Sequence, residues 1–353
     1  MNKMLLLFIG ILFLTSASLA QNYQLVWSDE FNDTALNDFI WKYNLTNNNG
    51  WGNNELEYYT NNPTNISLSN GNLLITARKE NYQGFQYTSA RIETRIAWTY
   101  GKIEAKIKLP YGQGIWPAFW MLGNNINSVG WPKCGEIDIV EMIGGQNREN
   151  TIYGTAHWYY NGHAQYGLSY KLSTGNFSDG FHIFDITWDS QKIIWHIDGI
   201  QYCRIDLNSS LSAFQAPFFI LLNLAVGGNW PGNPNSTTVF PQTMTVDYVR
   251  VYQIAPTDVE ITPSIVNNFS LEQNYPNPFN PGTVIKYSIA LTGNVTLKIF
   301  DLLGREAAQL VNKYHERGNF SVNFDASKLS AGVYIYTLSS GRFSQSKKLM
   351  VIK

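Results

Sequence analysis

The chain has 353 residues, which is enough for one large domain and a smaller one. Charged residues make up only 14% of it, against about 25% in an average soluble protein, and aromatic residues make up another 14%. Eleven tryptophans and 21 tyrosines are more than a core of this size needs, and they indicate an aromatic surface of the kind found in sugar-binding clefts. The net charge of −1 argues against nucleic acid as a partner.

The N-terminus has the pattern of a signal peptide over residues 1–20. Lys3 supplies the positive start, residues 4–14 form an apolar run, and small residues at 18–20 suit signal peptidase. The run is too short to span a bilayer as a stable anchor, although a membrane anchor remains the alternative interpretation. We expect a mature chain that begins at Gln21 and passes through the periplasm, to be secreted or held at the cell surface.

Charge is uneven along the chain, which favours two units. Residues 21–259 carry 14 basic and 20 acidic side chains, a balance of −6, whereas residues 260–353 carry 10 and 6, a balance of +4. Pro, Thr and Asn become frequent after residue 254, as in a linker. The predicted organisation is a large domain over 21–254, a linker over 255–270 and a small domain over 271–353.

Residues 22–253 have the pattern of short β-strands. In residues 101–109 apolar side chains alternate with charged ones, so that the apolar set faces inward and the charges face out. Asp198-Gly199 separates two strand-like segments and predicts a tight hairpin. Long helical periodicity is absent, so the sequence predicts an all-β domain built as a sandwich of two antiparallel sheets.

The segment 135–142, Gly-Glu-Ile-Asp-Ile-Val-Glu-Met, carries three carboxylates in six residues. In a regular strand Glu136 and Asp138 share one face and Glu141 points the other way, because side chains alternate with period two. One extra residue in a bulge near Ile139-Val140 restores Glu141 to the face of the other two acids. Neighbouring carboxylates raise one another's pKa values, and acids of unequal pKa facing one sugar are what a glycosidase needs.

These acids suit a two-step mechanism that needs no cofactor. Glu136 is predicted to be the nucleophile and Glu141 the general acid/base, about 5–5.5 Å apart. Asp138, between them, is expected to hydrogen-bond one of the pair and hold it in the required protonation state. A solvated acidic face and a calcium site are the alternative interpretations of the same cluster.

Aromatic residues surround the acid segment in the sequence. Trp116 and Trp120 are four residues apart and share one face of a strand, and Trp131 lies five residues before Glu136. Indole rings stack on the apolar faces of sugars and offer an N–H to hydroxyls. We expect Phe119 to pack in the core and at least one of Trp116 and Trp120 to line a cleft.

The two cysteines, Cys134 and Cys203, are the only ones in the chain. In an exported protein they can pair, but the sequence does not show whether their Cα atoms lie close enough. Nothing near Cys134 supplies the base and electropositive setting that a catalytic thiol needs, so a structural role is expected.

The acid segment, Gly-Glu-Ile-Asp-Ile-Val-Glu at 135–141, resembles the active-site signature of glycoside hydrolase family 16. Its flanks resemble the bacterial laminarinase branch, the endo-β-1,3-glucanases, and the six-residue span from Glu136 to Glu141 is the bulged form of that branch. The resemblance implies a concanavalin-like β-jelly roll and retention of configuration. The matching segments are WSDEF at 27–31, GNNELEYY at 52–59, TSARI at 88–92, WPAFWML at 116–122, HW at 157–158 and LNLAVGGNWPG at 222–232.

The resemblance also implies roles for single residues. Glu136 matches the nucleophile, Asp138 the assisting acid and Glu141 the acid/base, and His157 matches a histidine beside the catalytic strand. The residues predicted to contact substrate are Asn53, Arg91, Trp116, Trp120, Trp131, His157 and Trp230.

A structural calcium ion is a further expectation from the resemblance. Many family members hold one on the convex side, far from the cleft. The matching positions are Glu30, Asp247 and the carbonyl of Gly71, whose oxygen atoms suit calcium. Unrelated surface acids remain the alternative.

The C-terminal unit resembles the sorting domains of type IX secretion. Residues 295–300 and 332–338 are its clearest strands, and its size fits a small immunoglobulin-like β-sandwich. The resemblance implies the type IX secretion machinery as a partner; a carbohydrate-binding sandwich is the alternative, although the unit has no Trp. The matching segments are NYPNPFNP at 274–281, IFDLLGRE at 299–306, LSAGVY at 329–334 and KKLMV at 347–351.

Taken together, the sequence predicts a secreted, monomeric endo-β-1,3-glucanase that acts on laminarin-like β-glucan. The alternatives are the same machinery on mixed-linkage β-glucan, agarose or carrageenan, a transglycosylase, and a non-catalytic glucan-binding protein. The acidic balance of the large unit does not suggest a sulfated substrate, and a lectin has no need for both Glu136 and Glu141.

Overall fold

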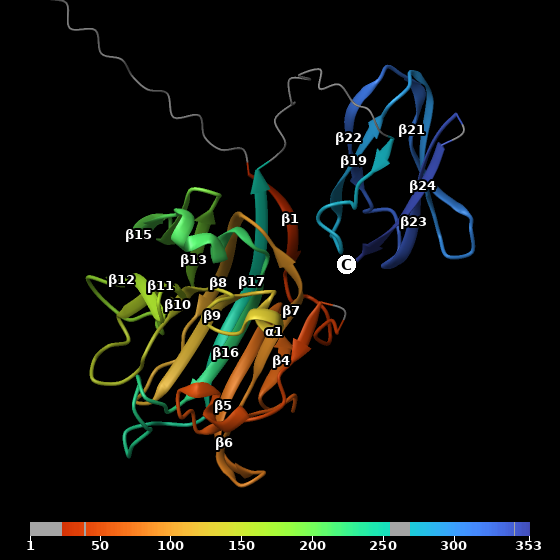
Figure 1. The fold of residues 1–353 in the computed structure, drawn as a ribbon. Coiled ribbons are helices and arrows are strands. Elements are labelled where there is room, and N and C mark those ends of the chain that lie inside the picture. Colours follow the sequence, from red (N-terminus) through yellow and green to blue (C-terminus); the bar gives the residue numbers. More distant parts are fainter. Residues whose placement is uncertain (1–22, 39, 255–268, 342) are drawn as a thin grey trace, which may run out of the picture.

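The computed structural model describes residues 23–38, 40–254, 269–341 and 343–353. Two β-rich units are visible in Figure 1, a larger one from red to green-blue and a smaller one in blue. The predicted signal peptide and most of the predicted linker lie outside the described residues. No helix in the described ranges is both long enough and apolar enough to cross a membrane.

The larger unit is a sandwich of two sheets, as predicted from the alternation of its strands. Every pairing in it is antiparallel except that of β3 with β6. The first sheet, in spatial order, contains β15 (Ile200–Asp206), β14 (Lys192–Ile197), β13 (His182–Trp188), β8 (Gly101–Lys108), β17 (Gln242–Ile254), β5 (Asn72–Tyr82), β6 (Phe85–Ser89) and β3 (Glu57–Tyr59), while β1 (Tyr23–Asp29) pairs with β17 and β4 (Ile66–Ser69) with β5. The second sheet contains β12 (His163–Lys171), β11 (Thr151–Tyr159), β10 (Glu136–Glu141), β9 (Ile115–Gly123), β16 (Phe218–Val226), β7 (Arg91–Trp98) and β2 (Trp41–Tyr43).

Alternation along the strands places one face of each sheet in a common core. Ile103, Ala105 and Ile107 of β8 are fully buried, which confirms the inward set predicted for residues 101–109. Glu104, expected to face out, is buried as well, because Lys102 and the Tyr248 hydroxyl cover its carboxylate. One hydrophobic cluster joins the inner faces of both sheets, and this confirms the predicted β-jelly-roll sandwich.

Tight connections hold the strands in register. Asp198 and Gly199 have φ angles of 48° and 79° and join β14 to β15, as the hairpin prediction requires. Helical structure within the described residues is confined to short pieces, which are α1 (Ile126–Val129) and the 3₁₀ segments Asn48–Gly52 and Ser209–Gln215.

The smaller unit is a second sandwich with its own core, centred on Tyr336, Leu297 and Ile285. Its size and two-sheet form are those expected for the C-terminal domain. One sheet contains β18 (Ser270–Leu271), β19 (Gly282–Ile289) and β22 (Gly318–Asp325), and the other contains β21 (Glu306–His315), β20 (Gly293–Phe300), β23 (Gly332–Ser340) and β24 (Phe343–Val351).

The two units touch near the C-terminus. Ile352 is only 3% exposed and belongs to the hydrophobic cluster of the larger unit. The Tyr275 hydroxyl accepts hydrogen bonds from the Thr99 backbone N–H at 3.1 Å and from Gln253 Nε2 at 3.3 Å. The end of the smaller unit is therefore anchored on the larger one by both apolar and polar contacts.

Candidate active site

The three carboxylates of β10 share one face because the strand contains a bulge. Against β9, Asp138 pairs with Trp120 and Val140 pairs with Phe119, so Ile139 is the extra residue. Against β11, the register likewise shifts between Asp138 and Glu141. The bulge predicted near Ile139-Val140 is confirmed, and Glu141 returns to the face of Glu136 and Asp138.

Side chains from the opposite sheet hold the bulge from the inside. Trp195 Nε1 on β14 donates a 2.7 Å hydrogen bond to the Asp138 carbonyl, and the Tyr202 hydroxyl on β15 lies 3.4 Å from the Ile139 carbonyl. Gly154 on β11 makes room for them, since a Cβ there would lie 2.4 Å from the Tyr202 hydroxyl and 2.5 Å from the Trp195 ring. The carbonyl groups released from the strand ladder thus have donors within the core.

Indole N–H groups hold the two glutamates. Trp131 Nε1 donates to Glu136 Oε2 at 3.0 Å, and Trp116 Nε1 donates to Glu141 Oε1 at 3.0 Å. Each glutamate therefore has one oxygen fixed by a tryptophan. Trp116 and Trp131, both predicted to contact substrate, thus contact the acids themselves.

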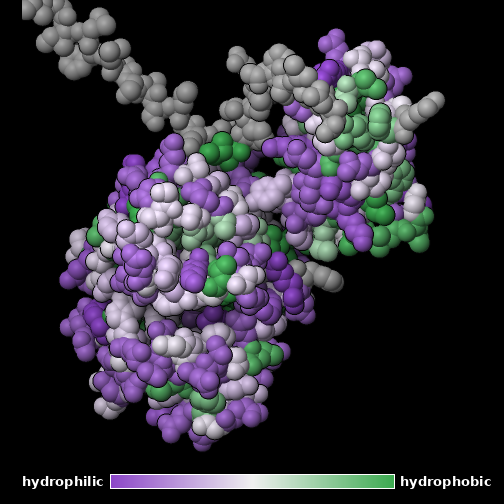
Figure 2. Space-filling model, in the orientation of Figure 1, coloured by the Kyte–Doolittle hydropathy of each residue, from purple (hydrophilic) through white to green (hydrophobic). Residues whose placement is uncertain are grey.

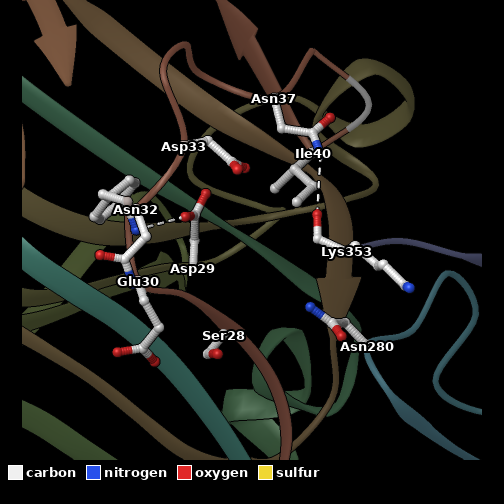
Figure 3. A pocket seen from close by; sticks show the side chains of 10 residues that line it. Ser28, Asp29, Glu30, Asn32, Asp33, Asn37, Ile40, Asn280 and Lys353 are labelled. Atoms are coloured by element: carbon white, nitrogen blue, oxygen red, sulfur yellow. Dashed lines mark hydrogen bonds between the residues drawn. The ribbon is translucent and has the colours of Figure 1, made fainter. Parts of the chain in front are cut away.

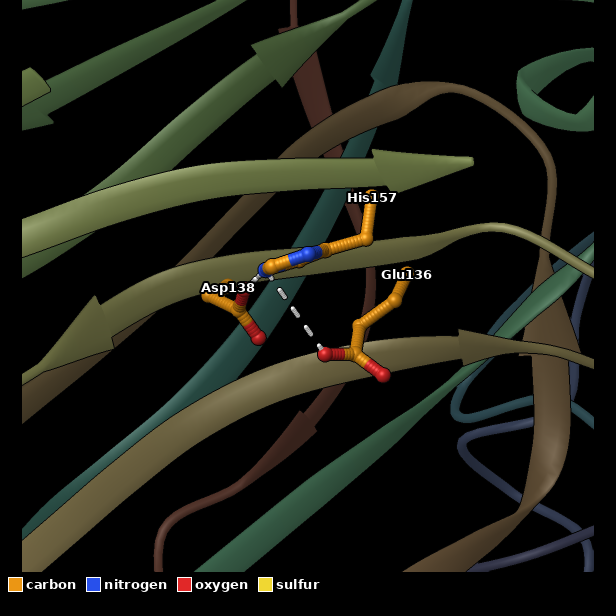
Figure 4. A group of neighbouring side chains, drawn as sticks. All are labelled: Glu136, Asp138 and His157. Atoms are coloured by element: carbon orange, nitrogen blue, oxygen red, sulfur yellow. Dashed lines mark ion pairs between the residues drawn. The ribbon is translucent and has the colours of Figure 1, made fainter. Parts of the chain in front are cut away.

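Asp138 makes its shortest side-chain contact with a histidine. His157 on β11 places Nε2 at 3.0 Å from Asp138 Oδ2 and 4.0 Å from Glu136 Oε1 (Figure 4). No well-directed hydrogen bond joins Asp138 to either glutamate among the described residues. The hydrogen bond expected from Asp138 to one of the glutamates is therefore not formed, and His157 Nε2 is instead the close polar neighbour of the Asp138 carboxyl.

All three carboxyl groups have raised pKa values. Burial, then the charge of Asp138, raises the pKa of Glu136 to about 8, while His157 and the Trp131 hydrogen bond oppose the shift. Burial raises the pKa of Asp138 to about 8. The pKa of Glu141 is raised well above its ordinary value by burial and by the two neighbouring acids. His157 and a tryptophan hydrogen bond oppose the shift at both glutamates, but two acids act on Glu141 and only Asp138 acts on Glu136, so Glu136 is the glutamate that ionises more readily.

A cleft of about 640 Å³ lies between β2, β7, β9 and β16, and its lining includes Leu122, the β9 residue paired with Glu136. Arg91 lines it, and its guanidinium carbon lies 4.0 Å from the Trp51 ring and 4.9 Å from the Trp120 ring. Arg91 Nε also donates to Asn44 Oδ1 at 3.0 Å. The predicted substrate residues Arg91 and Trp120 are thus brought together, with Trp51 as a partner that the sequence did not indicate.

Trp230 lies on the other side of the acids. Its ring meets Trp116 edge to face at 5.7 Å and Tyr153 at 4.9 Å, and 40% of the side chain is exposed. Trp131 is 49% exposed and packs on His163 at 4.6 Å. Both tryptophans therefore present an open ring beside the carboxylates, as a sugar-binding residue must.

A polar network that includes Asn53 and Asn223 lies behind Trp120. Asn53 Nδ2 donates to Glu55 Oε1 at 3.2 Å, and the Tyr59 hydroxyl donates to Glu55 Oε2. Asn223 Oδ1 accepts from Trp120 Nε1 at 2.7 Å, and Asn223 in turn donates to Tyr59. Sequence reasoning missed this network, although Glu55 lies within the segment 52–59 that carries the family resemblance.

The positions expected to hold calcium already carry ion pairs. Both oxygens of Glu30 accept hydrogen bonds from Arg250 at 2.8 Å, and Asp247 pairs with Lys106. Glu30 and Asp247 lie close enough for their charges to interact, so two of the expected oxygen donors do converge. Calcium would therefore have to displace Arg250 and Lys106 to bind here.

Two groups of acids among the described residues were considered as metal sites, and the first of them belongs to the acid site itself. Glu136, Asp138 and His157 have ligand atoms within 4.8 Å of one another, but the same atoms face the space expected for the sugar, so no metal ligand is assigned. A pocket of about 170 Å³ at the junction of the units is shown in Figure 3. Its acid Asp29 is already bonded to Trp41 Nε1, and Asn37 donates to the Lys353 carbonyl.

Cys134 and Cys203 are free and buried. Burial, with the nearby charge of Glu136, raises the pKa of the Cys134 thiol to about 11, so it carries no thiolate at neutral pH. This fits the structural role expected for it.

One face of the larger unit is mixed in polarity (Figure 2). On the face shown in Figure 2, the larger unit carries hydrophilic and weakly hydropathic residues side by side, with strongly hydrophobic residues scattered among them. Exposed aromatic residues of the larger unit include Tyr159 at 48% and Tyr160 at 62%. Tyr159 is the last residue of β11 and Tyr160 follows it, so both lie at the turn into β12.

Comparison with known proteins gives relatives along the larger unit. The chain is 41% identical over 260 residues to the clotting factor G alpha subunit of Tachypleus tridentatus, covering 71% of this chain and 37% of that one. It is 40% identical over 253 residues to a beta-glucanase of Rhodothermus marinus, covering 66% and 86%. The chain therefore spans about a third of the first relative and most of the second.

The fold also matches solved structures. The laminarinase catalytic domain of Thermotoga maritima MSB8 superposes with a TM-score of 0.61 at 47% identity, covering 66% of this chain and 98% of that one. Residues 273–353 match the model for a secretion system C-terminal sorting domain. Residues 51–250, more than half of the chain, match the model for glycosyl hydrolases family 16. The chain therefore belongs to glycosyl hydrolase family 16.

Proposed function

We propose that this chain is a secreted endo-β-1,3-glucanase that hydrolyses laminarin-like β-glucan with retention of configuration. The observation that carries the proposal is the bulge at Ile139, which puts Glu136 and Glu141 on one face of β10, each held by the indole N–H of a tryptophan. Two carboxyls on neighbouring positions of one strand suit the short spacing of a retaining glycosidase. The similar laminarinase of Thermotoga maritima supports the substrate class.

In the first step, ionised Glu136 attacks the anomeric carbon of the sugar. Glu141, kept protonated by its raised pKa, donates its proton to the departing glycosidic oxygen. The bond from Glu136 to the sugar forms as the glycosidic bond breaks, which gives a covalent glycosyl-enzyme. Trp116, bonded to Glu141 Oε1, orients the acid towards the leaving group.

In the second step, Glu141 acts as a base. It removes a proton from water, and the water oxygen attacks the anomeric carbon and releases Glu136. The two inversions leave the configuration unchanged. Trp131, bonded to Glu136 Oε2, stabilises the carboxylate that departs.

The test is product analysis of the purified enzyme on laminarin, barley β-glucan, agarose and carrageenan. We expect reducing ends from laminarin, with β-configured products seen first by proton NMR. Glu136→Gln and Glu141→Gln are expected to lower kcat at least ~10⁴-fold while the thermal transition remains cooperative. An α-configured first product, or wild-type turnover by Glu141→Gln, would contradict the mechanism; cleavage of another polymer alone would overturn the substrate.

The route by which the chain is exported is a separate part of the proposal. The sorting domain at 273–353 implies secretion or display at the cell surface. We propose that the segment at 1–20 is a signal peptide that delivers the chain to the periplasm first, and that the exported enzyme is a monomer. N-terminal sequencing of the exported protein should give Gln21, and light scattering should give the mass of one chain.

We also propose a structural calcium ion at Glu30, Gly71 and Asp247. Its carboxylate and carbonyl donors suit the ion, but binding requires Arg250 and Lys106 to release their acids. Millimolar calcium should raise the melting temperature of the EDTA-treated protein and should not do so in Asp247→Asn. An equal melting temperature with calcium and with EDTA would argue that the ion pairs alone serve this site.

A further inference from the structure

His163 is the partner of His157 on the side away from the acids. It opens β12 and lies opposite Tyr159 in the strand register. Its Nε2 atom is 2.8 Å from His157 Nδ1, and the two rings are close to parallel, with an interplanar angle of 20°. The Trp131 ring packs on His163 at 4.6 Å and reaches His157 at 6.4 Å.

The distances describe one continuous line of contacts. It runs from exposed His163 through both ring nitrogens of His157 to Asp138 Oδ2 at 3.0 Å, and Glu136 Oε1 is 4.0 Å from the same His157 nitrogen. Asp138 is only 3% exposed, so water cannot fully solvate its charge. A cation is therefore the fitting neighbour for Asp138, and His157 is in position to supply it.

We propose that His163 is a positioning residue that keeps His157 charged and directed at Asp138 and Glu136. This inference rests on the proposed function, since it concerns the same acids. When His157 carries both ring protons, Nε2–H points at Asp138 and Nδ1–H needs an acceptor. Nε2 of neutral His163 is that acceptor.

The charges around the pair agree with this arrangement. Partial burial and the charge of His157 lower the pKa of His163, so His163 stays neutral and can accept. His157 in turn lowers the pKa values of both glutamates against the effect of burial. The titratable or charged groups that face His157 are Glu136 and Asp138 from β10 and His163 from β12, and its charge also acts on Glu141. Arg91 from β7 acts on Glu136. Lys133 lies over the Tyr159 ring instead.

Loss of the His163 acceptor should change the pH dependence of kcat/KM and leave the fold intact. Without it, His157 loses its proton at lower pH, and Glu136 then needs a higher pH to ionise. We expect His163→Ala to move the acidic limb of the kcat/KM profile on laminarin upward by about half to one pH unit. His163→Gln keeps an acceptor oxygen and should restore most of the wild-type profile. Tyr166→Ala, on the opposite face of the same strand from His163 and 42% exposed, is the matched control.

A second measurement keeps the inference separate from the proposed function. Nitrogen-15 NMR of the histidine rings should show His157 as an imidazolium at pH 7 in the wild type and in His163→Gln, and as a neutral ring in His163→Ala. If neither the wild type nor any of the variants cleaves laminarin, the proposed function is wrong. The NMR result alone then decides the role of His163. If the wild type is active and His163→Ala matches it in both profile and NMR, the inference is overturned.

Discussion

At the scale of single residues, the site is defined by three closely spaced acids with raised pKa values, of which Asp138 is buried and Glu136 and Glu141 are partly buried. Burial raises the pKa of each of them, and the only basic side chain recorded within 4.0 Å of them among the described residues is His157. The indole donors Trp116 and Trp131 select one oxygen on each glutamate. The unequal roles proposed for Glu136 and Glu141 therefore depend on their neighbours, because the side chains themselves are identical.

The raised pKa of Glu136 predicts a stability change with pH. Its pKa is about 8 in the folded chain and 4.5 without the fold, so between these values ionisation favours the unfolded state and stability falls as pH rises. Glu136→Gln removes this dependence. The melting temperature of this variant, relative to that of the wild type, should therefore be higher at pH 8 than at pH 5. Thermal unfolding at both pH values measures it, with exposed Asp206→Asn as control. An equal difference at both pH values would mean that Glu136 is already ionised in the folded protein at pH 5.

At the scale of elements, β10 was largely predictable and its support was not. The spacing of the three acids in this six-residue strand predicts a bulge, because regular alternation would place Glu141 on the face opposite to Glu136 and Asp138. Trp195 and Tyr202, which hold the bulge carbonyls, lie more than 50 residues further on in the other sheet. No local pattern reveals such a pairing, because both residues also fit an ordinary alternating strand.

The Trp195 hydrogen bond predicts a cost for a conservative change. Trp195→Phe leaves the Asp138 carbonyl without its donor and should cost about 1–3 kcal/mol more than the lost ring volume explains. Trp98→Phe is the control, since Trp98 is also fully buried but its Nε1 has no hydrogen-bond partner. Chemical unfolding gives both free energies, and kcat on laminarin should fall only for Trp195→Phe. Equal losses in the two variants would show that the bulge does not depend on this bond.

At the scale of the whole molecule, two cores meet at one small junction. The predicted sandwich classes follow from alternation and hairpins, but the contact of Ile352 with the larger unit has no signature in the sequence. Residues that are far apart in the chain come together there only after both units have folded. His163 and Glu55 lie within the larger unit, and they were not predicted because strand alternation does not reveal their side-chain contacts with His157 and with Tyr59.

The junction predicts a change in stability without a change in turnover. Ile352→Ala should destabilise the larger unit by about 2–4 kcal/mol, since the side chain is 3% exposed, and should leave kcat/KM within about two-fold. Calorimetry and laminarin hydrolysis measure the two effects. Leu303→Ala, at a site 79% exposed in the smaller unit, is the control and should change neither. An unchanged melting temperature in Ile352→Ala would show that the units separate in solution.

The Arg91 guanidinium has a consequence for how tightly the cleft binds. It is held between the Trp51 and Trp120 rings and bonded to Asn44, so its rotamer is already fixed when the chain folds. Immobilising a long side chain on binding costs about 0.5–1.5 kcal/mol of affinity, and here that entropy is lost during folding instead. A glucan that reaches this cleft therefore meets a rigid receptor, and variants that loosen the indole pair should weaken binding through entropy even where every polar contact remains.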